Sequence, residues 1–355
     1  MSTTQRNHKT VHWAPFITTF ILPLLLCLGI LNGGLWAWAP IIWAFVLIPT
    51  LDELTGDDTT ERDEHTPYGN AYDWILLAWV PVECCVLSAA FWSIGHGEWT
   101  TFEWLGLVLS MGTSVGGGGI TVAHELMHRR DKRSRAAAEF LMTCASYPHF
   151  CVEHILGHHK NIGTHEDPAT ARYGESLYMF WPRTLIGTVR SAWELETIRV
   201  SRRNIPWWSL KNRRFRHPLN VAAFYGFAAL LGGGPAVLFA IAQSIVAILL
   251  LETVNYLEHY GLERARTPAG NYERVAPHHS WNSNHRITGW QMFYLNRHSD
   301  HHARADRPYP NLRAYADVPS LPAGYPTMML AAFIPPLWFA WMNPRVDAAR
   351  ARAAA

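Results

Sequence analysis

The sequence predicts an all-α integral membrane protein with six transmembrane helices and a histidine-rich cap domain on the cytoplasmic side. Three observations support this fold class. Hydrophobic residues make up 49% of the 355 residues, apolar runs alternate with segments dense in Arg, Lys, His and Asp, and the basic residues can all be placed on one side of a membrane. Runs of about 18 or more apolar residues are typical of membrane-spanning helices. We treat residues 1–355 as a single membrane-embedded domain.

Six apolar segments are predicted to span the membrane: residues 14–31, 35–51, 72–94, 102–123, 219–231 and 235–257. The fifth is short, but it leads through Gly232, Gly233, Gly234 and Pro235 into the sixth, and this run predicts a tight hairpin. Residues 32–34, with the sequence Asn-Gly-Gly, predict the same kind of turn between the first two spans.

The distribution of basic residues predicts the orientation. If the N-terminus is cytoplasmic, the outer loops are residues 32–34, 95–101 and 232–234, and these contain no Lys or Arg. All 30 Lys and Arg residues then lie inside, as the positive-inside rule requires. An odd number of spans would break this segregation, so we expect both termini in the cytoplasm. The long segments 124–217 and 258–343 would form the cap there. No cleavable signal peptide is apparent.

Four segments outside the spans carry expectations of their own. Residues 177–200 are predicted to form an interfacial amphipathic helix, whereas residues 328–342 are apolar but broken by Pro335 and Pro336. The Ala/Arg-rich tail after Pro344 is expected to be disordered or a linker stub. The acidic stretch 52–64 is expected to be a solvated loop, with a docking surface or structural caps for the cap domain as the alternative.

Nine histidines are the strongest functional signal in the chain. Three clusters and one isolated position contain them: His124 and His128; His154, His158 and His159; His298, His301 and His302; and His259. Neutral imidazole binds Zn, Fe, Cu and Ni. Histidines at i and i+4 on a helix point the same way, so one cluster can hold one metal from one face. Nine ligands exceed what one ion accepts, which predicts two metals.

His259 joins this set because of its neighbours. Glu252, Asn255 and His259 lie at i, i+3 and i+7 on one face of the sixth span. Polar side chains at membrane depth are costly and mark functional sites, so this face is expected to look into the metal site.

Carboxylates beside the histidines are candidates to hold imidazole N–H groups, as metal-bound histidines usually require. These carboxylates are Glu125, Glu153, Asp167, Glu258 and Asp300. We assign a catalytic role to Glu125, Glu258 and Asp300 among them.

Two features of the spans concern packing. The run Gly116–Gly119 permits close backbone approach, for which helix packing is the expected reason and substrate access the alternative. The bulky aromatics Trp38, Trp43, Trp79 and Phe91 are expected to pack within the membrane or to limit the length of a bound chain.

Two other classes of protein remain open at this point. The pattern His124-Glu-Leu-Met-His128 occurs in zinc metalloproteases, with Glu125 as general base, but an intramembrane protease would leave the other seven histidines without a role. A metal transporter would need polar residues that continue through the spans to the far face, and we find no such continuation.

Ligand chemistry alone leaves iron, zinc and copper open, because the site is rich in histidine and has no thiolate. The five cysteines form no Cys-x-x-Cys pair, so no rubredoxin-type or iron–sulfur centre is encoded. A multi-metal site under apolar helices suits a lipophilic substrate that enters from the bilayer, and activated oxygen on metals supplies the oxidant that inert C–H bonds need. No nucleic acid partner is expected.

The histidine motifs resemble those of the integral-membrane, non-haem diiron alkane 1-monooxygenases, within the histidine-box family of membrane desaturases and hydroxylases. The matching stretches are residues 124–128, 153–159, 295–302 and, most discriminating, Asn255-Tyr-Leu-Glu-His-Tyr-Gly261. The similarity extends over most of the chain, including residues 277–283, and Asn296 departs from the Gln expected in the family.

This resemblance implies that the nine histidines share two iron ions and that O2 is the co-substrate. One oxygen atom would enter the terminal carbon of a medium- to long-chain n-alkane, giving a primary alcohol, and the other would leave as water. The resemblance also implies electrons from rubredoxin, reduced by an NAD(P)H-dependent rubredoxin reductase, and a place in the bacterial inner membrane. The nearest alternative is a related oxygenase or desaturase acting on alkylaromatic methyl groups or fatty acyl chains.

Basic residues at 129–135 and 211–216 are candidates to dock an acidic electron carrier. Anchoring to the lipids of the inner leaflet is the alternative for the same residues.

Overall fold

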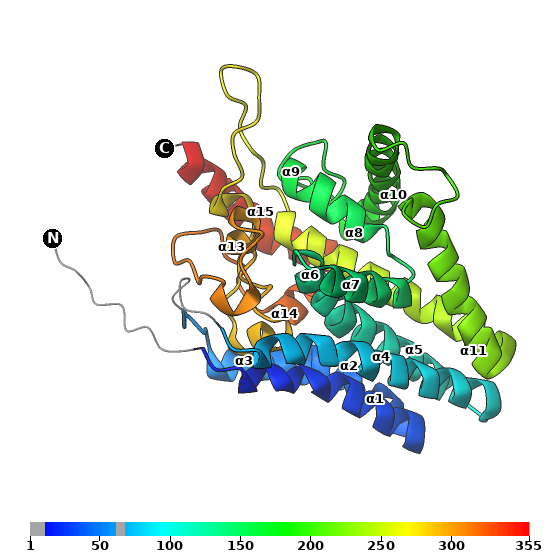
Figure 1. The fold of residues 1–355 in the computed structure, drawn as a ribbon. Helices are drawn as coiled ribbons and strands as arrows, with labels where there is room; N and C mark the ends of the chain where they lie inside the picture. The colour runs from blue at the N-terminus through cyan, green and yellow to red at the C-terminus, as the bar shows by residue number, and fades with distance from the viewer. Residues whose placement is uncertain (1–10, 62–67, 355) are drawn as a thin grey trace.

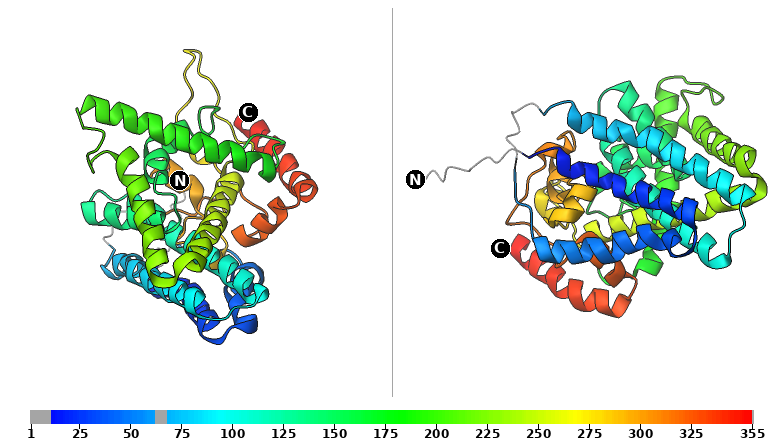
Figure 2. Two further views of the ribbon diagram at one scale, coloured as in Figure 1. Left: turned by 90° about the vertical axis from the view of Figure 1, so that its right-hand side faces the viewer. Right: turned by 90° about the horizontal axis from the view of Figure 1, so that it is seen from below.

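Long apolar helices run side by side through one part of the molecule, and shorter helices and loops cover one end of them (Figures 1 and 2). The computed structural model describes residues 11–61 and 68–354. Within those ranges the regular structure is helical, and β-pairing is confined to three isolated bridges. The all-α fold class is therefore confirmed for the described residues.

Five helical stretches are long and apolar enough to cross a membrane: Ala14–Asn32, Gly34–Thr55, Ala71–His96, Thr101–Met127 and Arg213–His259. The first contains η1 (Ala14–Phe20) and α1 (Ile21–Asn32), and the second runs from η2 (Gly34–Trp38) through α2 (Ala39–Ile42) and η3 (Trp43–Leu47) to α3 (Ile48–Thr55). The third is α4 (Ala71–His96), and the fourth joins α5 (Thr101–Ser114), η4 (Val115–Gly119) and α6 (Ile120–Met127). The first four predicted spans are confirmed as helices within a few residues, and the chain is a multi-pass membrane protein.

The last two predicted spans lie in one helical stretch, α11 (Arg213–His259), which has a break in the middle. Gly232 and Gly233 leave the helical conformation there, and Gly233 has a φ of 63°, which glycine adopts without strain. Figure 2 shows the two halves of α11 meeting at a sharp angle. A Cβ on Gly95 would come within 2.2 Å of Gly232 Cα, so the end of α4 packs directly against the break. The predicted hairpin residues are thus the site of the bend.

The remaining helices make up the covering layer. Those between the fourth and fifth spans are α7 (Lys132–Cys144), α8 (Phe150–Glu153), η5 (His154–His158), α9 (His159–Asn161) and α10 (Leu177–Arg202). Those after α11 are η6 (Pro277–His279), α12 (Arg286–Gln291), α13 (His298–Ala303), η7 (Tyr309–Asn311), α14 (Tyr325–Ala332) and α15 (Pro335–Ala354). The helix predicted at 177–200 is present as α10, and the predicted break at Pro335 separates α14 from α15.

The expectation of a disordered tail after Pro344 is wrong, because α15 continues to Ala354. Val346 on this helix is fully buried, and its methyl groups lie against Gly261, where an added Cβ would be 2.9 Å away. Arg350 donates to the Gly261 carbonyl oxygen at 3.1 Å. The tail helix therefore packs on the segment that follows α11.

The expectation of a solvated loop is wrong for the two aspartates of the acidic stretch that are buried, Asp52 and Asp58. Asp52 accepts hydrogen bonds from the backbone N–H groups of Ile287 and Thr288, at 2.8 and 3.0 Å, and so caps the start of α12. Asp58 accepts a hydrogen bond from the Tyr294 hydroxyl at 2.7 Å. The structural-cap alternative is the correct one here. Residues 62–64 of the stretch lie outside the described residues.

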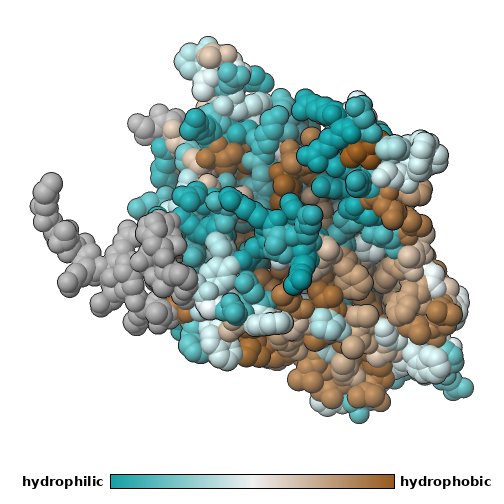
Figure 3. Space-filling model, in the orientation of Figure 1, coloured by the Kyte–Doolittle hydropathy of each residue, from teal (hydrophilic) through white to brown (hydrophobic). Residues whose placement is uncertain are grey.

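Apolar side chains are segregated on the surface as well as in the core. Leu31, Leu35 and Leu230 are 75–82% exposed although they lie on or beside candidate spans. Figure 3 shows hydrophobic surface over the long helices and hydrophilic surface over the covering layer. Such an outer surface is favourable in lipid and costly in water.

Candidate metal centre

All nine predicted histidines come together in two adjacent sets. Their potential ligand atoms lie within 4.8 Å of one another in each set. The five-histidine set contains His124, His128, His154, His159 and His301, and the four-histidine set contains His158, His259, His298 and His302. The sets touch, since the ring centroids of His159 and His302 are 4.5 Å apart.

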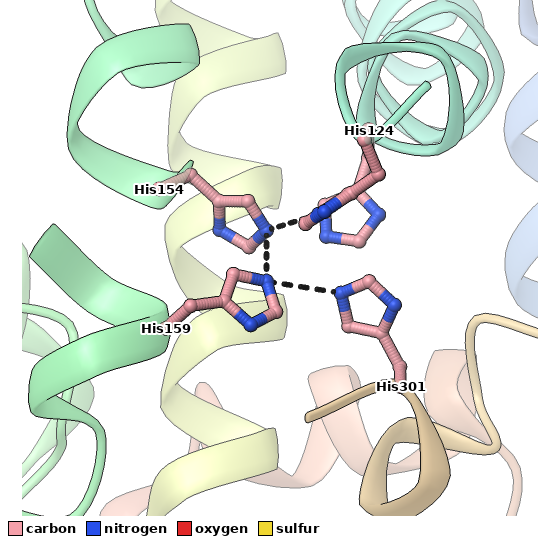
Figure 4. A group of neighbouring side chains, drawn as sticks. His124, His154, His159 and His301 are labelled. Atoms are coloured by element: carbon pink, nitrogen blue, oxygen red, sulfur yellow. Dashed lines mark hydrogen bonds between the residues drawn. The ribbon is translucent and has the colours of Figure 1, made fainter. Parts of the chain in front are cut away.

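The Nε2 atoms within each set converge on a common point. In the five-histidine set, His154 Nε2 lies 3.1 Å from His128 Nε2 and 3.0 Å from His159 Nε2, and the latter lies 3.2 Å from His301 Nε2. In the four-histidine set, the His158–His302 and His298–His259 Nε2 distances are both 3.2 Å. Figure 4 shows His124, His154, His159 and His301 pointing toward one another from three parts of the chain: α6, the continuous turn of η5 and α9, and α13.

These distances fit metal binding better than hydrogen bonding. A neutral imidazole has one N–H group, so a chain of Nε2 atoms in mutual contact leaves lone pairs facing each other. Two nitrogens bound to one metal at about 2.1 Å are about 3.0–3.4 Å apart at right or tetrahedral angles. The observed separations fall in this range, and a cation between the rings would remove the lone-pair repulsion.

Burial keeps the histidines in the form that binds metals. It lowers the pKa well below the usual value for the rings outside the candidate spans, namely those of His128, His154, His159, His298, His301 and His302. These imidazoles are therefore neutral near pH 7, with a lone pair available on a ring nitrogen.

Histidines four positions apart share a set in the first and last clusters, but not in the cluster that contains His154. His124 and His128 lie in one set, and so do His298 and His302. His154 and His158 lie in different sets, because η5 is a π-helical turn in which the residue five positions on comes beneath the first. His159 consequently joins His154. The second and third clusters therefore each supply both sets, which answers how the nine histidines divide, a point that the sequence left open.

Asp167 orients His158 by binding Nδ1, the ring nitrogen that points away from the four-histidine set. Its Oδ2 lies 2.9 Å from His158 Nδ1 and also accepts a hydrogen bond from the Thr170 hydroxyl at 2.6 Å. Burial alone would lower the pKa of His158, but the Asp167 carboxylate outweighs it and raises that pKa to about 9. With Nδ1 engaged in this way, Nε2 is directed into the four-histidine set.

Glu258 lies beside the ring nitrogen of His298 that points into the four-histidine set. Its Oε2 lies 3.2 Å from His298 Nε2, the nitrogen that also meets His259. Its Oε1 accepts a hydrogen bond from the Tyr325 hydroxyl at 3.0 Å. Sequence reasoning missed Tyr325, because it lies in an apolar segment at no fixed spacing from a histidine.

Glu125 and Asp300 face away from the histidines. Arg129 donates to Glu125 Oε1 at 2.8 Å, and the Tyr309 backbone N–H donates to the same oxygen at 3.3 Å. Asp300 is fully buried and accepts from Arg307 at 2.6 Å and from the Arg313 backbone N–H at 2.9 Å. These contacts tie α6 and α13, which carry four of the nine histidines, to the segment that follows α13.

An apolar cavity ends at the two histidine sets. His124, His154 and His298 line its inner end, together with Asn255, Glu258 and Tyr325. Farther away it is lined by side chains from four of the candidate spans, among them Leu22, Phe45, Ile120 and Leu250. The face of α11 that carries Asn255 does look toward the site, as predicted, and Asn255 Nδ2 donates to Glu252 Oε2 at 3.2 Å.

The run Gly116–Gly119 serves both packing and the cavity. A Cβ on Gly118 or Gly119 would lie 2.1 Å from Trp79 or Glu83 on α4, which confirms the packing role. Gly117 has nothing within 4 Å of an added Cβ and lines the cavity, as does Gly116.

Comparison with known proteins points to one class of enzyme. The sequence pattern of the fatty acid desaturase family matches residues 102–332. The chain is 42% identical to alkane 1-monooxygenase 1 of Pseudomonas aeruginosa, over 89% of this chain and 85% of the relative. It is 40% identical to alkane 1-monooxygenase 2 of the same organism, over 97% and 93% of the two chains. A xylene/toluene monooxygenase hydroxylase component of Pseudomonas putida is more distant, at 27% identity over 90% of this chain and 86% of the relative.

Proposed function

Because the chain belongs to the alkane 1-monooxygenases, within the fatty acid desaturase family, we propose that it hydroxylates the terminal carbon of medium- to long-chain n-alkanes with O2. The balanced reaction consumes an alkane, O2, two electrons and two protons, and yields a primary alcohol and water. A non-haem diiron centre, when bound, supplies the O2 activation that an unactivated C–H bond requires. The observation that carries the proposal is the pair of histidine sets at the end of an apolar cavity.

Iron is the metal that we assign to both sets. Structural zinc sites are almost always tetrahedral with four ligands, whereas one set here offers five imidazoles. Neither set includes a thiolate, which soft-metal and iron–sulfur sites would use. We propose that the five-histidine set holds one iron and the four-histidine set holds the other.

The cavity is the proposed path of the alkane. Its walls between the spans are apolar. A hydrocarbon chain that binds there therefore gains about 0.8 kcal/mol, relative to water, for each methylene that it buries. Its polar groups are concentrated near His124, His154 and His298, where the terminal carbon would lie. This gradient orients the chain with one methyl group toward the centre.

The carboxylates have different proposed roles. Glu258 is the group placed to hold or transfer a proton at Oε2, which faces the centre, while Tyr325 fixes Oε1. Glu125 and Asp300 we propose to act as positioning residues, because their oxygens bind Arg129 and Arg307.

Topology and electron supply complete the proposal. We propose six spans, with the bend at Gly232 and Gly233 as the outer hairpin and with both termini and the cap in the cytoplasm of a bacterial inner membrane. Electrons would come from rubredoxin and its NAD(P)H-dependent reductase, because the five cysteines of this chain form no Cys-x-x-Cys pair.

Product analysis tests the proposal. Purified protein, iron, rubredoxin, rubredoxin reductase and NADH would be given octane, dodecane, xylene and a fatty acid in separate reactions. We expect 1-octanol or 1-dodecanol, and a dependence of sustained turnover on rubredoxin. Oxidation of xylene without oxidation of an alkane would favour the alkylaromatic alternative, for which the 27% identical relative is the precedent. Desaturation without hydroxylation, or one zinc and no iron per chain, would overturn the proposal.

A further inference from the structure

A second hollow lies on the surface, away from the apolar cavity, between α4, α7, α10 and the first half of α11. Six basic side chains line it: Lys132, Arg135, Arg199, Arg203, Arg213 and Arg216. We call this hollow the basic groove. It shares no lining residue with the cavity that ends at the histidines.

The six cations of the basic groove outnumber the two carboxylates beside them, Glu139 and Glu196. Arg216 forms an ion pair with Glu139 at 2.5 Å, and Arg199 forms one with Glu196 at 2.5 Å. Within residues 11–61 and 68–354, no hydrogen bond or ion pair engages the side chains of Lys132, Arg135, Arg203 or Arg213. Four like charges around one hollow repel each other, and a bound anion would relieve that repulsion.

The floor and walls of the basic groove are apolar. Leu87 and Phe224 are buried at its base, and Phe140, Leu156 and Phe227 line it while 39–41% exposed. Phe227 lies on α11, in a stretch apolar enough to span a membrane. In Figure 3 hydrophilic surface over α7 and α10 borders hydrophobic surface over the long helices. The groove therefore combines cations with apolar surface that belongs in lipid.

We propose that the basic groove binds an anionic phospholipid. The phosphodiester would lie among Lys132, Arg135, Arg203 and Arg213, and the acyl chains would cover Phe140, Leu156 and Phe227. Clusters of Arg and Lys between helices at the membrane surface recognise such headgroups. An acidic carrier protein is the other class of ligand that such cations attract, and the variants described below distinguish it from a lipid.

The bound lipid would stabilise the supports of the metal centre. Its phosphate would join α7, which begins at Lys132 shortly after His128, to α10 and α11. The Glu139–Arg216 ion pair already connects α7 to α11 at the same place. A lipid that binds only the folded protein raises its melting temperature, and the rise grows with the logarithm of lipid concentration once this exceeds Kd.

The experiment uses the full-length protein, purified in a neutral detergent and stripped of lipid. Phosphatidylglycerol and phosphatidylcholine are titrated in, with native mass spectrometry to count bound lipids and thermal melting to report stability. We expect one phosphatidylglycerol to bind and to raise the melting temperature, and phosphatidylcholine to do neither. Glycerol 3-phosphate, which has the phosphate without the chains, should not compete.

A matched pair of double variants locates the site. Arg135→Gln with Arg203→Gln removes two groove cations, whereas Arg133→Gln with Arg202→Gln removes the same charge from exposed positions outside the groove. We expect the groove double variant to bind phosphatidylglycerol about tenfold or more weakly, and the control to bind like the wild type. Melting temperatures without lipid should be similar for all three proteins, since none of these four side chains makes a hydrogen bond or ion pair with a described residue.

Three results would overturn the proposal: equal weakening by both double variants, equal binding of the two lipids, or competition by glycerol 3-phosphate alone. A groove double variant that keeps its lipid but loses rubredoxin-driven turnover would also overturn it, and would assign the groove to the electron carrier.

Discussion

Replacing Gly117 with leucine is predicted to shorten the alkane that the enzyme accepts. Gly117 lines the apolar cavity and has nothing within 4 Å of an added Cβ, so a side chain there enters open space rather than a neighbouring helix. It precedes His124 by seven residues, which corresponds to about 10 Å along a helix. An extended alkyl chain, with bonds of about 1.5 Å, covers this distance with about eight carbons.

The expected magnitude follows from the methylenes that leucine would displace. A leucine side chain occupies roughly the space of three or more methylenes, and each displaced methylene forfeits about 0.8 kcal/mol of burial. The loss of about 2.4 kcal/mol corresponds to roughly a 60-fold fall in kcat/KM for alkanes long enough to pass residue 117. Octane should be affected little, and hexadecane strongly.

The assay compares kcat/KM for octane, dodecane and hexadecane in the variant and the wild type, with iron content measured in each preparation. Gly226→Leu is the matched control, because Gly226 also faces open space but does not line the cavity. An equal fall for octane and hexadecane in the Gly117 variant, with iron retained, would refute the proposed path.

Three further predictions concern the metal centre and the supporting layer. Asp167→Asn should weaken iron binding about 10–100-fold, as judged by metal titration, because His158 loses its charged partner; unchanged affinity would show that Asp167 does not orient the ring. His259→Ala should reduce iron from about two to about one per chain by elemental analysis, since His259 belongs to the four-histidine set alone; two retained irons would remove it from the ligands. Burial alone would raise the pKa of Glu139, but His217 and Arg216 outweigh it and lower that pKa to about 2. The stability from this pair is therefore complete above the usual pKa of 4.5 and is lost as the pH falls toward 2. Glu139→Gln should therefore reduce the loss of unfolding free energy between pH 5 and pH 3 by about 2 kcal/mol, and an unchanged loss would contradict the reasoning.

The gross architecture and the set of histidines could be predicted from the sequence because they depend on local patterns. Length and apolarity located the first four spans within a few residues, and the glycines at 232 and 233 marked the bend in α11. The nine histidines were recognisable because each cluster has helical spacing, and because His259 shares a face with Glu252 and Asn255.

Features that depend on tertiary contacts could not be predicted in this way. The acidity of Asp52 and Asp58 indicated a solvated loop, yet both are buried where segments more than 200 residues away supply their donors. The Ala/Arg composition after Pro344 indicated disorder, but the tail is helical and Val346 packs against Gly261. The division of the histidines between two sets depends on the π-turn, and no residue type between His154 and His158 predicts such a turn.

Because of that π-turn, the division of the histidines between the two sets depends on helical phase. A π-turn is equivalent to one residue inserted into an α-helix, so refolding residues 154–158 as a regular α-turn, with no residue deleted, would rotate every later position by about 100°. His158 would then move toward the phase that His159 now occupies, and the partition of five and four would change without the loss of any histidine. Since η5 and α13 each supply both sets, a small rotation of either helix would displace ligand atoms in both sets together. The two histidine sets are therefore mechanically coupled, and neither can be altered without disturbing the other.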